Sequence, residues 1–253
     1  MKMTKLFTTV FDGEMKSRGF KRKAKLYYRL NGDNLQGVVI KTVNPYSIHF
    51  YSAPYWMESI QADLFPLQKG YWAEISTSIS PHWSARYYEE NEQFNFDNMN
   101  LCFTLAKDHI LPIMDKMNDL DSYIENCVPS WSGFGTEINR CVIEIGPDDV
   151  EEGYSFLVDF PIKMVWHVWD MYTYSAFLQY ACLKGDLQKG YDLLEEKGAL
   201  MPDSWGSKEY AQNKYAEFMT DDGLQRAEQY LADRRKIMLP RLRDELGLDT
   251  SGV

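Results

Sequence analysis

The sequence predicts an α+β protein, with an N-terminal helix on an antiparallel meander sheet of about four to six strands, followed by a C-terminal helical region. Three observations predict this class. An apolar stripe with helical spacing opens the chain, side chains then alternate with a period of two through residue 52, and helical spacing returns from Pro161 onward. With 253 residues, 45% of them hydrophobic, the chain is long enough to bury a sizeable core.

The first helix is predicted from apolar residues at four-residue steps, Phe7, Phe11 and Met15. Gly19 follows the last predicted turn, and glycine often ends a helix there because it has no Cβ to oppose a left-handed conformation. Phe20 comes directly after this glycine, where an apolar side chain often packs back on the final turn.

The meander is predicted from a change of period after the helix. Residues 25–30 alternate between two faces, which is typical of a half-buried strand. Residues 31–34 (NGDN) tolerate positive φ and predict a tight hairpin. The second strand runs to Val43, residues 44–45 (NP) turn the chain, and residues 47–52 form the third strand.

The middle of the chain adds a strand and a helix. Residues 71–80 alternate clearly and are expected to complete a four-stranded antiparallel sheet. Residues 87–97 are interpreted as an acidic, aromatic loop, with Asp97 capping the helix that follows. Pro112 predicts a kink or a restart, and the apolar stripe continues to Cys127.

The rest of the chain is predicted to add two short strands and then four helices, two of which form a hairpin around residues 185–186 (GD). The strands are residues 137–146 and 154–160, and the helices are residues 162–183, 186–197, 207–219 and 222–246. The predicted domains are residues 1–160 and 161–253, with one continuous domain as an equal alternative.

Residues 18–23 (RGFKRK), 26–29 (LYYR) and the strand that begins at Gln36 resemble the bacterial domain-of-unknown-function family 4304. The resemblance covers roughly residues 5–125 and implies a helix that leads into an antiparallel sheet backed by helices. Lys41-Thr42 departs from the family, which has a polar pair beginning with Gln at that place. The resemblance implies no catalytic residues.

The charge distribution narrows the classes of partner. The net charge is −10, which makes nucleic acid an unlikely partner because phosphate contacts need cations. Residues 1–29 nevertheless hold nine Lys and Arg against two acids. Residues 21–23 (KRK) are interpreted as a solvated connection; an anion site is the alternative, but a helix C-terminus is the wrong pole for an anion.

The sequence predicts a cytoplasmic protein that needs no cofactor. Its four cysteines have no CxxC spacing, which favours buried thiols in a reducing compartment. No signal peptide is expected, and the apolar runs are too short to cross a membrane. No metal or nucleotide motif occurs, so the prediction includes no metal site.

Two groups of residues are candidates for binding. His82, at a strand end, forms a candidate ligand-contacting cluster with three neighbours, although a structural role is the more common one for such a residue. This cluster consists of His82, Trp83, Arg86 and Tyr87.

Two acidic groups form a candidate surface for a basic partner, with solvated loops as the alternative interpretation. They consist of Glu89, Glu90 and Glu92, and of Asp148, Asp149, Glu151 and Glu152.

The leading functional hypothesis is a non-enzymatic module that binds a basic protein, since no catalytic motif is present. One form of it is an immunity-type protein that occupies a basic toxin. The alternative is a small-molecule binder or an enzyme with a pocket between the sheet and the C-terminal helices, with His82 at its mouth. A third hypothesis is a structural protein that dimerises through a sheet edge or through the last helix. The sequence leaves the oligomeric state open.

Overall fold

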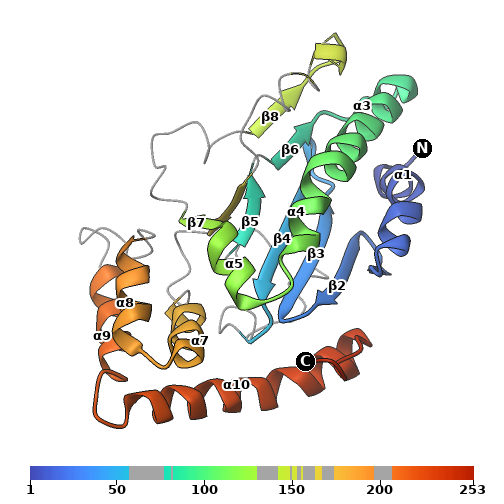
Figure 1. Ribbon diagram of the computed structural model, residues 1–253. Helices are drawn as coiled ribbons and strands as arrows, with labels where there is room; N and C mark the ends of the chain where they lie inside the picture. Colours follow the sequence, from blue (N-terminus) through green and yellow to red (C-terminus); the bar gives the residue numbers. More distant parts are fainter. Residues whose placement is uncertain are drawn as a thin grey trace.

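The computed structural model confirms the α+β class, with a sheet flanked by helices (Figure 1). It describes residues 1–56, 77–80, 82–129, 142–148, 150–152, 155, 163–166, 174–196 and 207–253. The helices are α1 (Met3–Ser17), α3 (Glu92–Leu105), the π-helical turn η3 (Ala106–Ile110), α4 (Leu111–Lys116), α5 (Leu120–Asn126), α7 (Tyr174–Lys184), α8 (Leu187–Glu196), α9 (Ser207–Ala216) and α10 (Gly223–Leu246). The strands are β1 (Lys21–Lys23), β2 (Leu26–Asn31), β3 (Asn34–Lys41), β4 (Tyr46–Pro54), β5 (Thr77–Ser80), β6 (His82–Ala85), β7 (Cys127–Pro129), β8 (Val142–Ile145) and β9 (Lys163–Trp166).

The sheet contains the predicted antiparallel meander and extends beyond it. Strands β1 to β5 are antiparallel neighbours in chain order. Beyond β5 the sheet continues through β9 to β7, and β6 joins β4 to β8, which gives nine strands within the described ranges. Two of these pairings, β6 with β8 and β7 with β9, are parallel.

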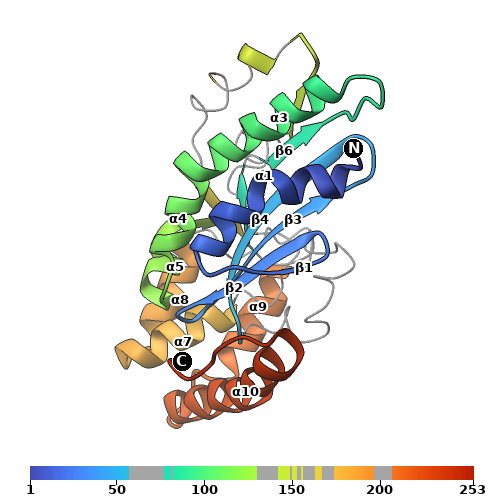
Figure 2. The ribbon, with the colours of Figure 1, turned by 90° about the vertical axis from the view of Figure 1, so that its right-hand side faces the viewer.

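Both faces of β2 are covered, which corrects the expectation of a half-buried strand. The ring of Tyr27 packs 5.4 Å from that of Phe7 in α1. The adjacent Tyr28 points to the opposite face, where its hydroxyl donates to the carbonyl of Leu246 in α10, at 3.2 Å. Figure 2 shows α1 against the meander and α10 crossing at its lower end. Alternation along one strand could not reveal that its second face is covered by a helix more than 200 residues later in the sequence.

The end of α1 is as predicted. Gly19 has a φ of +80°, and the Phe20 amide donates back to the Met15 carbonyl at 2.9 Å.

The basic residues that follow are exposed to solvent, as predicted, and they form edge strand β1 rather than a connection without a strand. Arg22 pairs with Asp12 at 3.1 Å, and Lys21 donates to the carbonyl of Gly247 after α10. Charged side chains on an edge strand also discourage pairing with another chain.

Helix α3 begins five residues before the predicted cap. The Asn91 side chain accepts from the Phe94 amide at 3.0 Å and caps the helix, so the predicted loop ends at Asn91. Asp97 lies inside the helix and accepts from the Gln93 side chain at 2.8 Å. Asparagine caps a helix as well as aspartate does, and Glu92 in the first turn complements the helix dipole. Pro112 restarts the helix as α4, as predicted.

After residue 160, the described residues form helices and their connections, except at β9. Residues 163–166 form a strand that pairs with β5, so the prediction of helix from Pro161 onward is wrong there. A short apolar run such as KMVW does not distinguish strand from buried helix by its periodicity. The hairpin of α7 and α8 is confirmed: Gly185 has a φ of +66°, and the Asp186 amide donates to Ala181 at 3.0 Å. The expected strand at 154–160 lies outside the described residues, apart from residue 155, which is helical.

Candidate functional site

The predicted ligand cluster is divided between the core and the surface. Trp83 is only 1% exposed and lies opposite Ile48 across the β4–β6 pair. Arg86 is exposed and Tyr87 is half-buried in the segment that follows β6. His82 begins β6, and its side chain lies outside the described residues.

The parallel pairing of β6 with β8 brings the two acidic groups to one end of the molecule. Ala85 and Ile145, the last residues of these strands, are register partners. Because the strands run in the same direction, the segments that follow them leave the sheet at the same edge. Figures 1 and 2 agree on this placement from two directions. We call this region, which follows Ala85 and Ile145, the acidic end.

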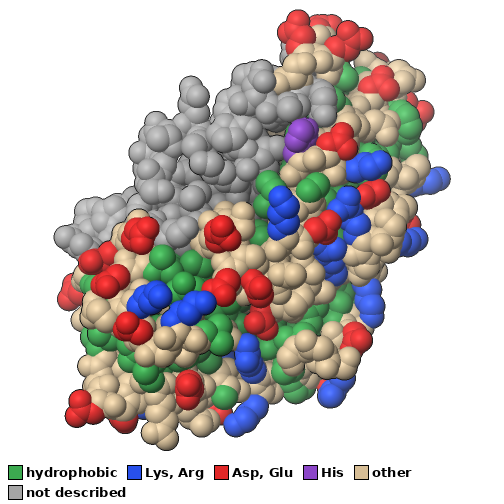
Figure 3. Space-filling model, in the orientation of Figure 1, with side chains coloured by type: hydrophobic (Ala, Val, Ile, Leu, Met, Phe, Trp, Pro, Cys, Tyr) green, Lys and Arg blue, Asp and Glu red, His purple; other side chains and the backbone are tan. Residues whose placement is uncertain are grey.

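The carboxylates of the acidic end are solvent-exposed, and Asp and Glu side chains gather at the top of Figure 3. The described members are Glu89, Glu90, Glu92, Asp148, Glu151 and Glu152. Asp149 lies outside the described residues. Glu92 pairs with the amino group of Met1, and this hydrogen bond is the main cause that lowers the pKa of Glu92.

Apolar side chains also reach solvent at the acidic end. Val43, in the turn between β3 and β4, is 79% exposed, and Phe96 in the first turns of α3 is 42% exposed. The turn is attached to this end because the Tyr87 amide donates to the Asn44 side chain at 3.1 Å. Exposed apolar side chains such as these supply area that a bound partner would bury.

A hollow of about 230 Å³ opens between the start of α1 and the first turns of α3. Its lining consists of Met1, Leu6, Tyr87, Glu92, Gln93, Asn95 and Phe96. Asn95 is already engaged, since its side chain accepts from the Tyr88 amide and donates to the Tyr88 carbonyl. The hollow is smaller than the roughly 300–1,000 Å³ of usual small-molecule sites. It has room for one side chain.

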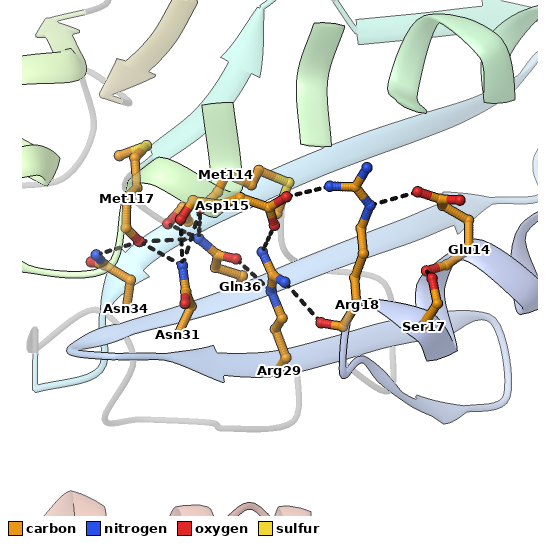
Figure 4. A network of polar contacts seen from close by, with 11 residues as sticks. Glu14, Ser17, Arg18, Arg29, Asn31, Asn34, Gln36, Met114, Asp115 and Met117 are labelled. Atoms are coloured by element: carbon orange, nitrogen blue, oxygen red, sulfur yellow. Dashed lines mark hydrogen bonds and ion pairs between the residues drawn. The ribbon is translucent and has the colours of Figure 1, made fainter. Parts of the chain in front are cut away.

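A second polar cluster, the Arg29 network, is buried between α4 and strands β2 and β3 (Figure 4). Arg29 is 8% exposed and donates to Gln36 Oε1 and to the Arg18 carbonyl, both at 2.8 Å, and to Asp115. Arg18 also pairs with Asp115 and with Glu14. Burial lowers the pKa of Arg29, and its bond to Asp115 opposes that shift.

Side-chain amides from β2 and β3 complete this network by capping the end of α4. Gln36 Nε2 donates to the Met114 carbonyl at 2.6 Å, and Asn34 Nδ2 donates to the Met117 carbonyl at 2.9 Å. The last carbonyls of a helix have no partner inside the helix, so these amides satisfy groups that would otherwise be orphaned. The donors of the Arg29 network are therefore used within the fold, and we assign it a structural role.

The hairpin beside the Arg29 network yields a prediction with a pH signature. Burial raises the pKa of Asp33 above its ordinary value of 3.8, although Arg235, 3.5 Å away, opposes the shift. An acid with a raised folded pKa costs stability once it ionises. We expect Asp33→Asn to be more stable than wild type at pH 7, with a difference that vanishes below pH 3.8. Urea unfolding of both proteins between pH 3 and 7 measures this; a less stable variant at pH 7 would mean that the Arg235 pair dominates.

The described cysteines behave as inert core residues. Cys102 is fully buried, and burial raises the pKa of its thiol well above the ordinary value. Burial also raises the pKa of Cys182 to about 11. Both thiols are therefore protonated at neutral pH, which makes them poor nucleophiles. Among the residues that the structure describes, no group of His, Cys, Asp and Glu is arranged to hold a metal ion.

The contact between the sheet and α10 is packed where the structure describes it. Met238, Leu242 and Leu246 of α10 are buried. Arg234 Nε donates to the Trp56 carbonyl at 3.0 Å within this interface. The pocket that the alternative hypothesis places between the sheet and the C-terminal helices would have to lie elsewhere along these helices.

Fold and surface together define an α+β protein with two covered sheet faces and an acidic, partly apolar end. No protein-family model matches the chain, and neither a curated protein sequence nor a solved structure matches it significantly. The resemblance to family 4304 stays a prediction. In the described part of the chain, no helix is long and apolar enough to cross a membrane.

Sequence reasoning missed the apolar members of the acidic end, Val43 and Phe96. The predicted loop includes Phe96 because Asp97 fits a helix cap. The Asn91-Glu92 pair is the signal that could have placed it, since a capping residue followed by an acid marks a helix start. The predicted second strand includes Val43, and no local pattern indicates that this residue lies beside the segment after β6.

Proposed function

We propose that this chain is a non-enzymatic, cytoplasmic protein-binding module that recognises a basic protein through its acidic end. The observation that carries the proposal is the parallel β6–β8 pairing, which joins two acidic segments about 60 residues apart into one surface. Exposed Val43 and Phe96 supply apolar area within it.

Charge and apolar area contribute differently to such an interface. Exposed ion pairs add about 0–1 kcal/mol each, so the carboxylates alone give modest affinity. Their combined field raises the association rate, and this effect weakens with salt because the Debye length is about 8 Å at physiological ionic strength. Burial of the apolar side chains supplies affinity that salt does not screen. We therefore expect the association rate to depend more strongly on salt than the dissociation rate does.

An immunity-type protein that occupies a basic bacterial toxin is the specific form of this proposal. A toxin inhibitor has to bind quickly, and an acidic surface that steers a basic protein serves that requirement. A basic reading frame beside the gene, whose product is toxic alone and harmless with this chain, would support this form.

The experiment compares neutralised variants during co-purification from the native host at low salt. The test variant is Glu89→Gln, Glu90→Gln, Asp148→Asn and Glu151→Gln, and the control is Glu228→Gln, Asp233→Asn and Glu245→Gln on exposed positions of α10. We expect wild type and control to retain one basic protein, and the test variant to associate with it about 10- to 100-fold more slowly. Equal association with both variants, or no basic partner for wild type, would contradict the proposal.

A further inference from the structure

We infer that the hollow beside α3 receives a single lysine or arginine side chain of the basic partner. This inference rests on the proposed function and specifies how the acidic end recognises its partner. Leu6, Tyr87 and Phe96 provide apolar and aromatic lining for the aliphatic stem, and Glu92 lies at the rim for the charged head. Lysine and arginine combine such a stem and head in one side chain.

The lining selects a cation over an anion. Glu92 is the charged side chain among the residues that line the hollow, and the lining also includes the positive amino group of Met1, which pairs with Glu92. Its side chain is 73% exposed and already accepts an ammonium group, that of Met1, so a partner's cation would compete with this group. Aromatic rings such as those of Tyr87 and Phe96 also attract the cationic groups of arginine and lysine. This attraction is stronger where the contact excludes water.

Three nearby features oppose a cation, and together they are smaller than the charge of the three nearby glutamates. The amino group of Met1 carries one positive charge. The N-terminus of α3 carries the positive pole of the helix dipole, equivalent to about half an elementary charge. Arg86 adds one exposed positive charge. Glu89 and Glu90 precede the helix and, with Glu92, carry three negative charges, slightly more than the about two and a half positive charges of these three features.

Size makes one side chain the best fit. The volume of the hollow, about 230 Å³, is below the range of usual cofactor and metabolite sites. A side chain anchored in a pocket at the centre of charged and apolar groups is the usual form of an interface hot spot. The partner residue that enters the hollow should therefore contribute more to binding than its neighbours.

The test uses N-acetyl-arginine amide as a probe and needs no partner. Titration into the full chain, followed by NMR, is expected to shift the signals of Tyr87 and Phe96 saturably. Glu92→Gln and Phe96→Ala should each weaken binding of the probe about two- to fivefold. The matched controls, Asp233→Asn and Leu183→Ala, replace an exposed acid and an exposed apolar residue elsewhere and should leave the affinity unchanged. Circular dichroism verifies that each variant is folded.

The outcomes separate this inference from the proposed function. Absence of saturable shifts, or equal affinity in Glu92→Gln, would overturn the assignment of the hollow. If the neutralised acidic end loses the basic partner while Phe96→Ala binds both partner and probe as wild type does, the proposed function stands and the inference fails. If the probe binds as expected but wild type retains no basic protein, the site stands and the proposed partner class is wrong.

Discussion

Replacing Gly32 by alanine is expected to destabilise the protein by more than about 4 kcal/mol, among the largest effects of a single substitution. Gly32 lies in the β2–β3 hairpin with a φ of +54°, a conformation that costs other residues about 1–2 kcal/mol. A Cβ at this position would also lie 1.7 Å from the backbone carbonyl oxygen of Asn118. That oxygen accepts from the Asp33 amide at 3.0 Å, so it cannot move without breaking the contact that joins the hairpin to the segment after α4.

Urea unfolding measures the change, with Gly13→Ala as the matched control. Gly13 lies inside α1, and a Cβ there would meet nothing within 4 Å. Alanine is a better helix former than glycine, so the control should be about 1 kcal/mol more stable than wild type. A Gly32→Ala protein that unfolds at the same urea concentration as wild type would show that the hairpin does not dock as described.

Removing the Asp115 carboxylate is expected to destabilise the fold by about 2 kcal/mol, because the buried positive charge of Arg29 then lacks its carboxylate partner. Breaking a fully buried pair costs more, but the Asp115 side chain is 37% exposed and water screens part of the loss. Arg29 would retain its bonds to Gln36 and to the Arg18 carbonyl.

A double-mutant cycle tests this coupling. We expect Asp115→Leu to be strongly destabilising alone and the addition of Arg29→Met to recover part of the loss, because no buried charge then remains unpaired. Asp233→Asn is the control, since it removes an exposed pair with Lys236 and should cost less than about 0.5 kcal/mol. Additive effects at positions 29 and 115 would contradict the Arg29 network.

The parts of the fold that sequence predicted are those that local chemistry determines. The four-residue spacing of Phe7, Phe11 and Met15 specifies α1, and Gly19 specifies its end. The hairpin at Gly32 and the hairpin at Gly185 follow from residues that tolerate positive φ. Each of these signals lies within a few residues of the structure that it predicts.

The parts that sequence did not predict depend on distant segments. Strand β9 forms because β5 and β7 lie on either side of it, and its own four residues do not specify a strand. Burial of Tyr27 and Tyr28 on opposite faces requires both α1 and α10. Local pattern cannot report contacts between segments that meet only in the folded chain.

The candidate site was predictable in composition and not in arrangement. The acidic residues that follow β6 and β8 are evident in the sequence, and six of them are exposed in the described part. Their convergence required the Ala85–Ile145 register, which joins strands 60 residues apart. The hollow required α1 and α3 to pack together, an arrangement illustrated by the 5.3 Å contact between the rings of Phe11 and Phe103.

Distances between spin labels on three exposed residues test the central claim, that the two acidic segments form one surface. Labels at Glu89 and Glu151 report on the acidic segments, and a label at Glu245 reports on the distant end of α10. We expect the distance from 89 to 151 to be narrowly distributed and the shortest of the three. A label at 151 that lies as close to 245 as to 89, or a 89–151 distance longer than either, would contradict it.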